Sequence, residues 1–96
     1  MKYPIPWLPE ALRDIQRLYD FLSGNSPGAA ADAALCIQAA ARRLELFPEI
    51  GRPMDDGTSR REMFAAFGAG AYVVRYRVND EGNPVIIRVW HNRENR

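Results

Sequence analysis

Two stretches in the first half of the chain repeat apolar residues at every third or fourth position. The first begins near Pro9, and its apolar positions are Leu8, Ala11, Leu12, Ile15, Leu18, Tyr19 and Leu22. The second follows Ser26-Pro27, and its apolar positions are Ala30, Ala33, Ala34, Ile37, Ala41, Leu44 and Phe47. This spacing predicts two amphipathic helices, each with proline in its first turn. The acidic residues Glu10 and Asp14 suit the positive end of the first helix dipole. Because alanine lets helices approach closely, we expect an antiparallel hairpin.

After Gly51 the apolar positions alternate instead, which is the pattern of half-buried strands. We expect residues 51–59 to form a polar loop, followed by strands over 60–67, 72–78 and 85–91. In the second strand, one face carries Tyr72, Val74, Tyr76 and Val78, and the other carries Val73, Arg75 and Arg77. In the last strand, one face carries Val85, Ile87, Val89 and His91, and the other carries Ile86, Arg88 and Trp90. The sequence therefore predicts a β-meander with one face packed on the helical hairpin.

The N-terminal segment alternates Tyr3, Ile5 and Trp7 with two prolines. Proline cannot donate to a strand ladder, so this segment is either an edge strand or an extended arm. The predicted order is β-α-α-β-β-β, an α+β fold with a helical hairpin on one face of a small, mainly antiparallel sheet. Residues 1–96 are short enough that we expect a single domain.

Composition excludes several classes of protein. Hydrophobic residues make up 47% of the chain and charged residues 26%, which is too apolar for a disordered chain. The one cysteine, Cys36, excludes an internal disulfide and a cysteine-built zinc site, and we expect a buried, unreactive thiol. No apolar run has the roughly 18–20 residues of a membrane span, and the N-terminus lacks a signal-peptide core. We therefore expect a cytoplasmic protein without membrane contact.

Arginine supplies nearly all of the positive charge. The net charge is only +1, but all 13 basic residues except Lys2 are arginines, and most lie in the second half of the chain. Arginine recognises carboxylates and phosphates through paired, planar hydrogen bonds. The distribution favours an acidic partner for the predicted sheet.

The strand face that the helices do not cover is the main candidate for a binding site. Its predicted side chains are Val73, Arg75, Arg77, Ile86, Arg88 and Trp90. A core does not tolerate three unpaired guanidinium groups, and a solvated face seldom carries tryptophan beside them. Arginine mixed with aromatic residues is typical of partner-binding surfaces. The alternative is an ordinary sheet surface, on which the arginines pair across strands with Glu62 and its neighbours.

His91 is the only histidine and the only side chain whose unperturbed pKa lies near neutrality. It is either a general acid or base flanked by Arg93, or a strand-end histidine bonded to the backbone. The sequence has no nucleophile elbow, no glycine-rich phosphate loop and no histidine pair for a metal. We therefore expect neither a metal nor an organic cofactor.

Five segments, taken in order, resemble the RelE/ParE toxin superfamily of bacterial type II toxin–antitoxin systems. They are residues 7–19, Pro48-Glu49-Ile50-Gly51-Arg52-Pro53, Arg61-Glu62, residues 72–78 and residues 87–93. The resemblance covers essentially the whole chain and implies the same β-α-α-β-β-β order. It also implies a cognate antitoxin whose C-terminal segment wraps across the toxin. An acidic, partly helical segment would suit the predicted face with Arg75, Arg77 and Arg88.

The superfamily contains two activities, and the resemblance leaves both open. ParE-like members poison DNA gyrase, whereas RelE-like members cleave mRNA on the ribosome without a metal. Gly51-Arg52-Pro53 and the ending at residues 89–93 resemble the ParE-like branch, and the chain lacks the lysines usual in the nuclease branch. We therefore favour gyrase as the target over the ribosome and its mRNA. A binding protein that keeps the fold without toxicity is a third alternative.

Each interpretation assigns different residues. Under the ParE-like interpretation no residue is catalytic, and the expected target contacts are Arg52, His91 and Arg93. Under the nuclease alternative, the residues that would bind phosphate and transfer protons are Arg61, Arg75 and His91.

Overall fold

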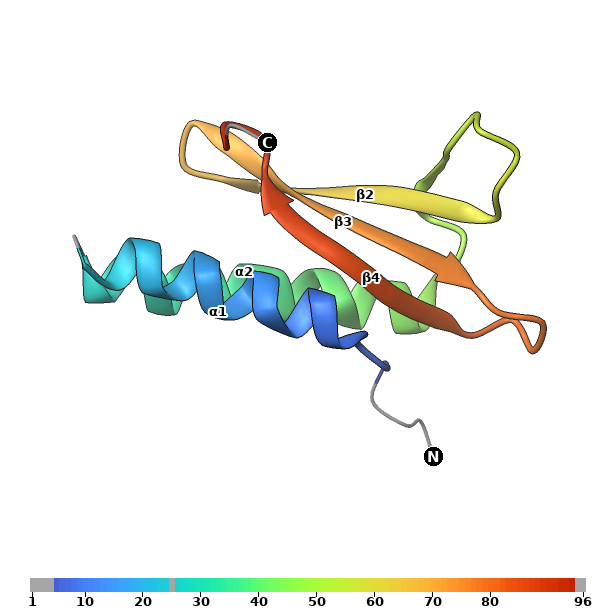
Figure 1. Ribbon diagram of the computed structural model, residues 1–96, viewed down its shortest axis with the longest axis horizontal. Helices are drawn as coiled ribbons and strands as arrows, with labels where there is room; N and C mark the ends of the chain where they lie inside the picture. Colours follow the sequence, from blue (N-terminus) through green and yellow to red (C-terminus); the bar gives the residue numbers. More distant parts are fainter. Residues whose placement is uncertain (1–4, 25, 95–96) are drawn as a thin grey trace.

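Two helices cover one face of a four-stranded antiparallel sheet in the computed structural model, which describes residues 5–24 and 26–94 (Figure 1). The helices are α1 (Pro9–Ser23) and α2 (Pro27–Leu46). The strands are β1 (Arg52–Pro53), β2 (Arg60–Phe67), β3 (Gly70–Val78) and β4 (Pro84–His91), in the spatial order β1-β2-β3-β4. The predicted α+β class and the packing of the hairpin on one sheet face are confirmed.

Both helices begin where the sequence predicts. Pro9 and Pro27 occupy the first turn, where a missing N–H breaks no helical bond. The Ser26 hydroxyl caps α2 by accepting a hydrogen bond from the Ala29 amide at 3.2 Å. In the described part of the chain, neither helix is long and apolar enough to cross a membrane.

The buried stripes of the helices differ from the predicted ones at several positions. Leu12, Tyr19 and Phe47 were expected in the core, but they are 56%, 44% and 61% exposed. Asp14, which the apolar pattern does not include, is only 2% exposed. The face of α1 that meets the sheet therefore contains a buried carboxylate.

The core lies between the hairpin and the sheet. β3 contributes Tyr72, Val74 and Tyr76, which are at most 2% exposed, and this confirms the predicted orientation of that strand. The other members of the core include Ala11, Leu18, Ala33, Ile37, Leu44, Met63, Ala65, Ile86 and Val89. Alanine at several helix positions lets α1 and α2 pack side by side beneath the sheet (Figure 1).

Gly51 lies where the backbone after α2 passes against Tyr76. The Gly51 amide donates a hydrogen bond of 2.8 Å to the Tyr76 hydroxyl oxygen. A Cβ at this position would lie 2.6 Å from Tyr76 Cε1 and 2.9 Å from the Glu62 carbonyl oxygen. Burial raises the pKa of Tyr76, so its hydroxyl stays neutral. The glycine of the Gly51-Arg52-Pro53 segment is thus required by packing.

The predicted N-terminal strand is reduced to one isolated bridge. Trp7 pairs in parallel with Ile86, and Tyr3 lies outside the described residues. The Ile86 amide donates to the Pro6 carbonyl at 3.0 Å, and the Leu8 amide donates to the Ile86 carbonyl at 2.9 Å. Pro6 has no N–H, and α1 begins at Pro9, so the segment cannot continue as a strand.

The fourth strand comes instead from the segment that was predicted to be a loop. Arg52 and Pro53 form β1 and pair with Glu62 and Arg61 of β2, respectively. Pro53 is accommodated because β1 is an edge strand. The described element order is therefore α-α-β-β-β-β.

A β-bulge changes the predicted faces at the start of β4. Arg75 pairs with Arg88, but Tyr76 pairs with Ile86, so Ile87 is an extra residue opposite β3. Ile86 is consequently fully buried in the core beside Tyr76. Its predicted place on the binding face was wrong, because the strict alternation of side chains breaks at the bulge.

Candidate functional site: the outer sheet face and the C-terminal corner

The outer face, meaning the sheet surface turned away from the helices, contains most of the predicted binding residues. Its larger side chains are Arg60, Glu62, Phe64, Val73, Arg75, Arg77, Val85, Arg88 and Trp90. Five of the six predicted residues occupy strand positions on this face, although the side chain of Arg88 turns away from it, and Ile86 lies in the core. The structure adds Arg60, Glu62 and Phe64 from β2, and also Val85, which the bulge turns outward.

Arg75 is held in the middle of the outer face. Its Nε and Nη2 atoms donate to Glu62 Oε2 at 3.0 and 2.8 Å. Its guanidinium carbon lies 4.9 Å from the centre of the Trp90 ring, within the range of a cation–π contact. The cross-strand pairing with Glu62 is the alternative that the sequence left open. Arg75 therefore presents a neutralised, stacked guanidinium.

The exposed positive charge of this face lies elsewhere. Arg77 is exposed and makes no ion pair within the described residues. Arg52 of β1 lies over the ring of Phe64, 5.9 Å from its centre, and Phe64 is 50% exposed. Phe64 was missed by the sequence analysis, although alternation within residues 60–67 would have assigned it to this face.

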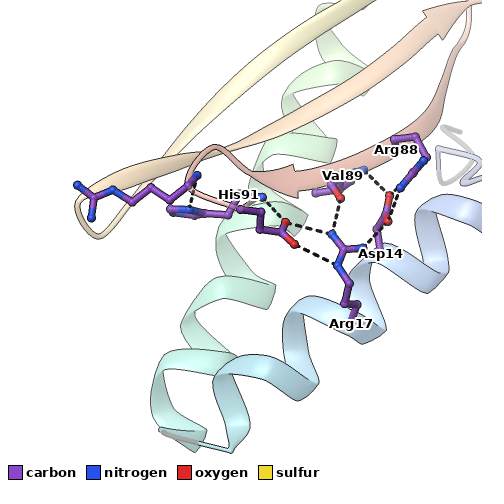
Figure 2. Close-up of polar contacts among 7 residues, drawn as sticks. Asp14, Arg17, Arg88, Val89 and His91 are labelled. Atoms are coloured by element: carbon purple, nitrogen blue, oxygen red, sulfur yellow. Dashed lines mark hydrogen bonds and ion pairs between the residues drawn. The ribbon is translucent and has the colours of Figure 1, made fainter. Parts of the chain in front are cut away.

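Arg88 leaves the outer face and turns around the edge of the sheet toward α1 (Figure 2). Its Nε donates to Asp14 Oδ2 at 2.7 Å, and its Nη2 donates to Asp14 Oδ1 at 3.1 Å. The Val89 amide donates to the same carboxylate at 2.9 Å, and Arg17 Nη1 donates at 2.6 Å. Burial alone would raise the pKa of Asp14, but these hydrogen bonds outweigh it and hold the pKa below its ordinary value.

A second carboxylate ties the C-terminal corner to the same helix. Glu94 accepts hydrogen bonds from Arg17 Nε and Nη2, both at 3.1 Å, and from the His91 amide at 2.8 Å. Arg17 thus bridges Asp14 and Glu94, and its position beside Asp14 is visible in Figure 2. Asn92 extends the sheet, because its amide donates to the Ala71 carbonyl at 2.9 Å. Residues 92–94 are therefore part of the folded structure.

His91 lies on the helix-facing side of the sheet, at the end of β4. Its Nδ1 accepts a hydrogen bond from the Arg93 amide at 3.2 Å, which leaves Nε2 as the other ring nitrogen for a partner. The ring meets Tyr72 edge-on, with centroids 5.1 Å apart. A Cβ on Gly70 would lie 2.7 Å from His91 Cε1, so glycine is needed for this ring position.

A mostly apolar cleft of about 490 Å³ opens beside His91. It is lined by Arg17, Leu18, Phe21, Leu22, Phe67, Tyr72, His91, Arg93 and Glu94. Phe21 is 70% exposed at its rim. The cleft brings two predicted target contacts, His91 and Arg93, to one place. The third, Arg52, lies on β1 at the far edge of the sheet and is not part of this corner.

The residues proposed for nuclease chemistry are dispersed. Arg61 donates to the carbonyl oxygens of Glu49 and Gly51 at 3.2 and 2.8 Å. Arg61 pairs with Tyr76 of β3, whereas His91 pairs with Tyr72 of the same strand. These two β3 positions are four residues apart, which is roughly 13 Å along a strand. Arg75 lies on the opposite sheet face from His91. No single phosphate group can contact all three side chains in this arrangement.

No metal centre is apparent in residues 5–24 and 26–94. No three His, Cys, Asp or Glu side chains there are grouped closely enough to hold an ion. Cys36, expected to be buried, is partly buried against the core and donates to the Ala66 carbonyl at 3.5 Å.

The helical hairpin, the four-stranded sheet and the arginine-bearing outer face together define a protein of the RelE/ParE toxin class. The family model described as "ParE toxin of type II toxin-antitoxin system, parDE" matches residues 5–96. The chain belongs to this family of type II toxins.

Similar proteins carry both superfamily names. "Toxin RelE1" of Caulobacter vibrioides is 39% identical over 87 residues, covering 90% of this chain and 89% of that protein. "Toxin RelE3" of the same organism is 35% identical over 88 residues, covering 92% of each. A chain of the solved "Chromosomal ParDE TA system from P. aeruginosa" superposes with a TM-score of 0.70 at 17% identity, covering 94% of this chain and 96% of that chain. The last similarity concerns the fold alone.

Proposed function

We propose that this toxin inhibits DNA gyrase in the cytoplasm and is neutralised by a cognate antitoxin. The observation that carries the choice of gyrase is the dispersal of Arg61, Arg75 and His91. Membership of the ParE toxin family favours the same choice. Under this proposal no residue is catalytic, and the protein acts by binding.

The dispersal matters because of what RNA cleavage requires. A metal-independent nuclease needs a proton-transfer group and positive charge around the same phosphate. In this chain Arg61 is engaged by two backbone carbonyls, and Arg75 is neutralised by Glu62. His91 lies near neither of them. The arrangement favours a binding role for His91 over a role in proton transfer.

We assign target contact to the C-terminal corner. His91 and Arg93 share a cleft with the exposed ring of Phe21, which offers an apolar anchor next to a cation. Arg52 lies at the opposite edge of the sheet, so its predicted role as a target contact requires a second contact area.

We assign antitoxin binding to the outer face. Arg75, Arg77 and Trp90 remain from the predicted set, and Phe64 joins them, whereas Val73 is only 4% exposed and offers little surface. Arg88 contributes less than expected because Asp14 already holds its guanidinium. An acidic antitoxin segment would find exposed charge at Arg77 and Arg52 and apolar surface at Phe64.

A RelE-like nuclease is the second candidate, and the names of the two Caulobacter relatives favour it. Induction of the toxin in a bacterial culture distinguishes the two. We expect growth arrest with DNA breaks and intact messages, and rescue by the antitoxin. Codon-phased cuts in mRNA without DNA breaks would establish the nuclease instead. Normal growth of cells containing folded toxin would identify a non-toxic binding protein.

A further inference from the structure

The side of α2 that points away from the core carries a second repeat. The buried residues of this helix, such as Ala33, Ile37 and Leu44, lie in the core. The residues on the opposite side, which we call the α2 stripe, are all exposed: Gly28, Asp32, Leu35, Ala39, Arg42 and Leu46. They follow one another in alternate steps of four and three residues. This is the heptad spacing of a helix that packs along another helix.

The α2 stripe contains two leucines that are far from buried. Leu35 is 63% exposed, and Leu46 is 59% exposed. Gly28, at the start of the stripe, has no heavy atom within 4 Å of where a Cβ would lie, so there is open space beside it. A single exposed leucine is ordinary on a protein surface. Leucines at heptad positions that alternate with small residues form instead a seam that a second helix can fill.

The two charged residues of the α2 stripe lack a partner of their own. Neither the Asp32 nor the Arg42 side chain forms a hydrogen bond or an ion pair within residues 5–24 and 26–94. They lie ten residues apart on the same helix, which is about 15 Å along its axis, so they cannot neutralise each other. A helix that satisfies both must carry the opposite charges at the same spacing and in reverse order.

We propose that the α2 stripe packs against the α2 stripe of a second copy of this chain, with the two helices antiparallel. A two-fold axis at the level of Ile37 places residues equally far from Ile37 opposite one another. The opposed pairs are Gly28 with Leu46, Asp32 with Arg42 and Leu35 with Ala39. Each leucine meets a small residue, and each charge meets its opposite. The contact is isologous, because the same surface serves both copies.

The charges also fix the direction of the pairing. In a parallel pair of helices equal positions face each other, so Asp32 would oppose Asp32 and Arg42 would oppose Arg42. Exposed ion pairs add little affinity, so the leucines supply the attraction and the charges select the antiparallel register. The α2 stripe shares no residue with the outer face or with the C-terminal corner. The inference therefore does not depend on the proposed target.

Charge reversal tests the pairing in toxin freed of its antitoxin. Asp32→Arg alone or Arg42→Asp alone places like charges opposite each other, and we expect the dissociation constant of the dimer to rise by about tenfold or more in sedimentation equilibrium. In an equimolar mixture of these two variants every arginine again faces an aspartate, so dimers should return. Arg13→Asp, on the exposed surface of α1, changes the net charge as much as Arg42→Asp does and should leave the dimer intact.

Truncation of a leucine tests the apolar part of the seam. We expect Leu35→Ala to raise the dissociation constant by about fivefold or more, because it removes the apolar group that faces Ala39. Leu12→Ala is the matched control, since Leu12 is 56% exposed on α1, and it should dimerise as the unaltered chain does. All the substituted residues are exposed, and thermal unfolding of each variant checks that it folds.

Three results would overturn the proposal. The unaltered toxin could sediment as a monomer at every concentration at which it stays soluble. Dimers could persist unchanged in both single charge reversals, which would place the interface on another surface. Finally, Asp32→Arg could weaken only the complex with the antitoxin while the toxin alone stays monomeric, which would assign the α2 stripe to the antitoxin.

Discussion

Asp14 and Arg88 join the first helix to the last strand through two hydrogen bonds, 2.7 and 3.1 Å long. Asp14 is 2% exposed, and its carboxylate also accepts a hydrogen bond from the Val89 amide, so it closes the β4 edge as well as neutralising a cation. Arg17 connects this carboxylate to Glu94 and so to the C-terminal corner. One helix face therefore organises both the sheet edge and the proposed target site.

Removing the Asp14 charge should destabilise the whole domain. Asp14→Asn keeps the shape but leaves Arg88 without its ion pair and weakens the bond to Val89. We expect a loss of roughly 2–4 kcal/mol in the free energy of unfolding, measured with urea. Asp20→Asn is the control, because Asp20 lies exposed on the same helix, and it should cost less than about 0.5 kcal/mol.

The same carboxylate predicts how stability depends on pH. Its folded pKa lies below its ordinary value of 3.8. The contribution to stability is thus complete above about pH 3.8 and is lost as pH falls through the lower, folded pKa. Urea unfolding from pH 6 to pH 2 should show a decline that is smaller in Asp14→Asn. Parallel pH profiles for the two proteins would contradict the assigned role.

Gly51→Ala should loosen the connection between α2 and the sheet. The added methyl group would lie 2.6 Å from Tyr76 Cε1, and relief requires the Tyr76 ring or the backbone to move. We expect a loss of roughly 1–3 kcal/mol in the free energy of unfolding. Gly28→Ala is the matched control, since no heavy atom lies within 4 Å of its added Cβ. Equal stabilities of the two variants would disprove the packing requirement.

The C-terminal corner can be tested by single substitutions. Deleting residues 92–96 would remove the Asn92 and Glu94 contacts, so lost toxicity in that truncation would not separate unfolding from lost target contact. Arg93→Ala removes only an exposed side chain. The hydrogen bond to His91 comes from the backbone amide of residue 93 and is kept. We expect unchanged unfolding and at least a tenfold rise in the toxin concentration needed to inhibit gyrase. Full potency would remove Arg93 from the target site.

Arg77→Glu tests the outer face as an antitoxin site. Arg77 is exposed and makes no ion pair among the described residues, so its reversal leaves the ion pairs of the fold intact, unlike a change at Arg75. We expect the dissociation constant of the toxin–antitoxin complex to rise at least fivefold. Arg13→Glu makes the same charge change on exposed surface of α1 and should bind normally. An unchanged constant for Arg77→Glu would move the antitoxin site off this face.

Local periodicity was sufficient to predict the helices and the three long strands. The start of α2 at Ser26-Pro27 and the alternating faces of residues 72–78 depend only on neighbours in sequence, so both could be predicted from the sequence. The bulge at Ile87 could not, because it is a relation between two strands that shifts register without changing composition. It moved Ile86 from the predicted site into the core.

The polar network was hidden for a related reason. The sequence analysis interpreted Asp14 as an acid suited to a helix N-terminus. No local pattern shows that Arg88, 74 residues later in the chain, places its Nε 2.7 Å from Asp14 Oδ2. Likewise, the alternation of side chains along the strands suggests that Arg75 and Arg88 are free cations. In the structure Glu62 neutralises Arg75, and Asp14 neutralises Arg88. Local periodicity supplied the α+β fold and family resemblance supplied the toxin class, whereas the partners of each arginine required the structure.

The proposed action on gyrase, without RNA cleavage, can be tested directly with purified proteins. Purified toxin, freed of antitoxin, should be added to a gyrase supercoiling and DNA-cleavage assay and, in parallel, to a translating extract analysed by primer extension. We predict gyrase-linked DNA breaks, lost supercoiling and uncut message. The His91→Ala variant should likewise leave the message uncut in the extract. Codon-phased cuts in the message with unaffected gyrase would contradict the account and make Arg61, Arg75 and His91 the residues to mutate first.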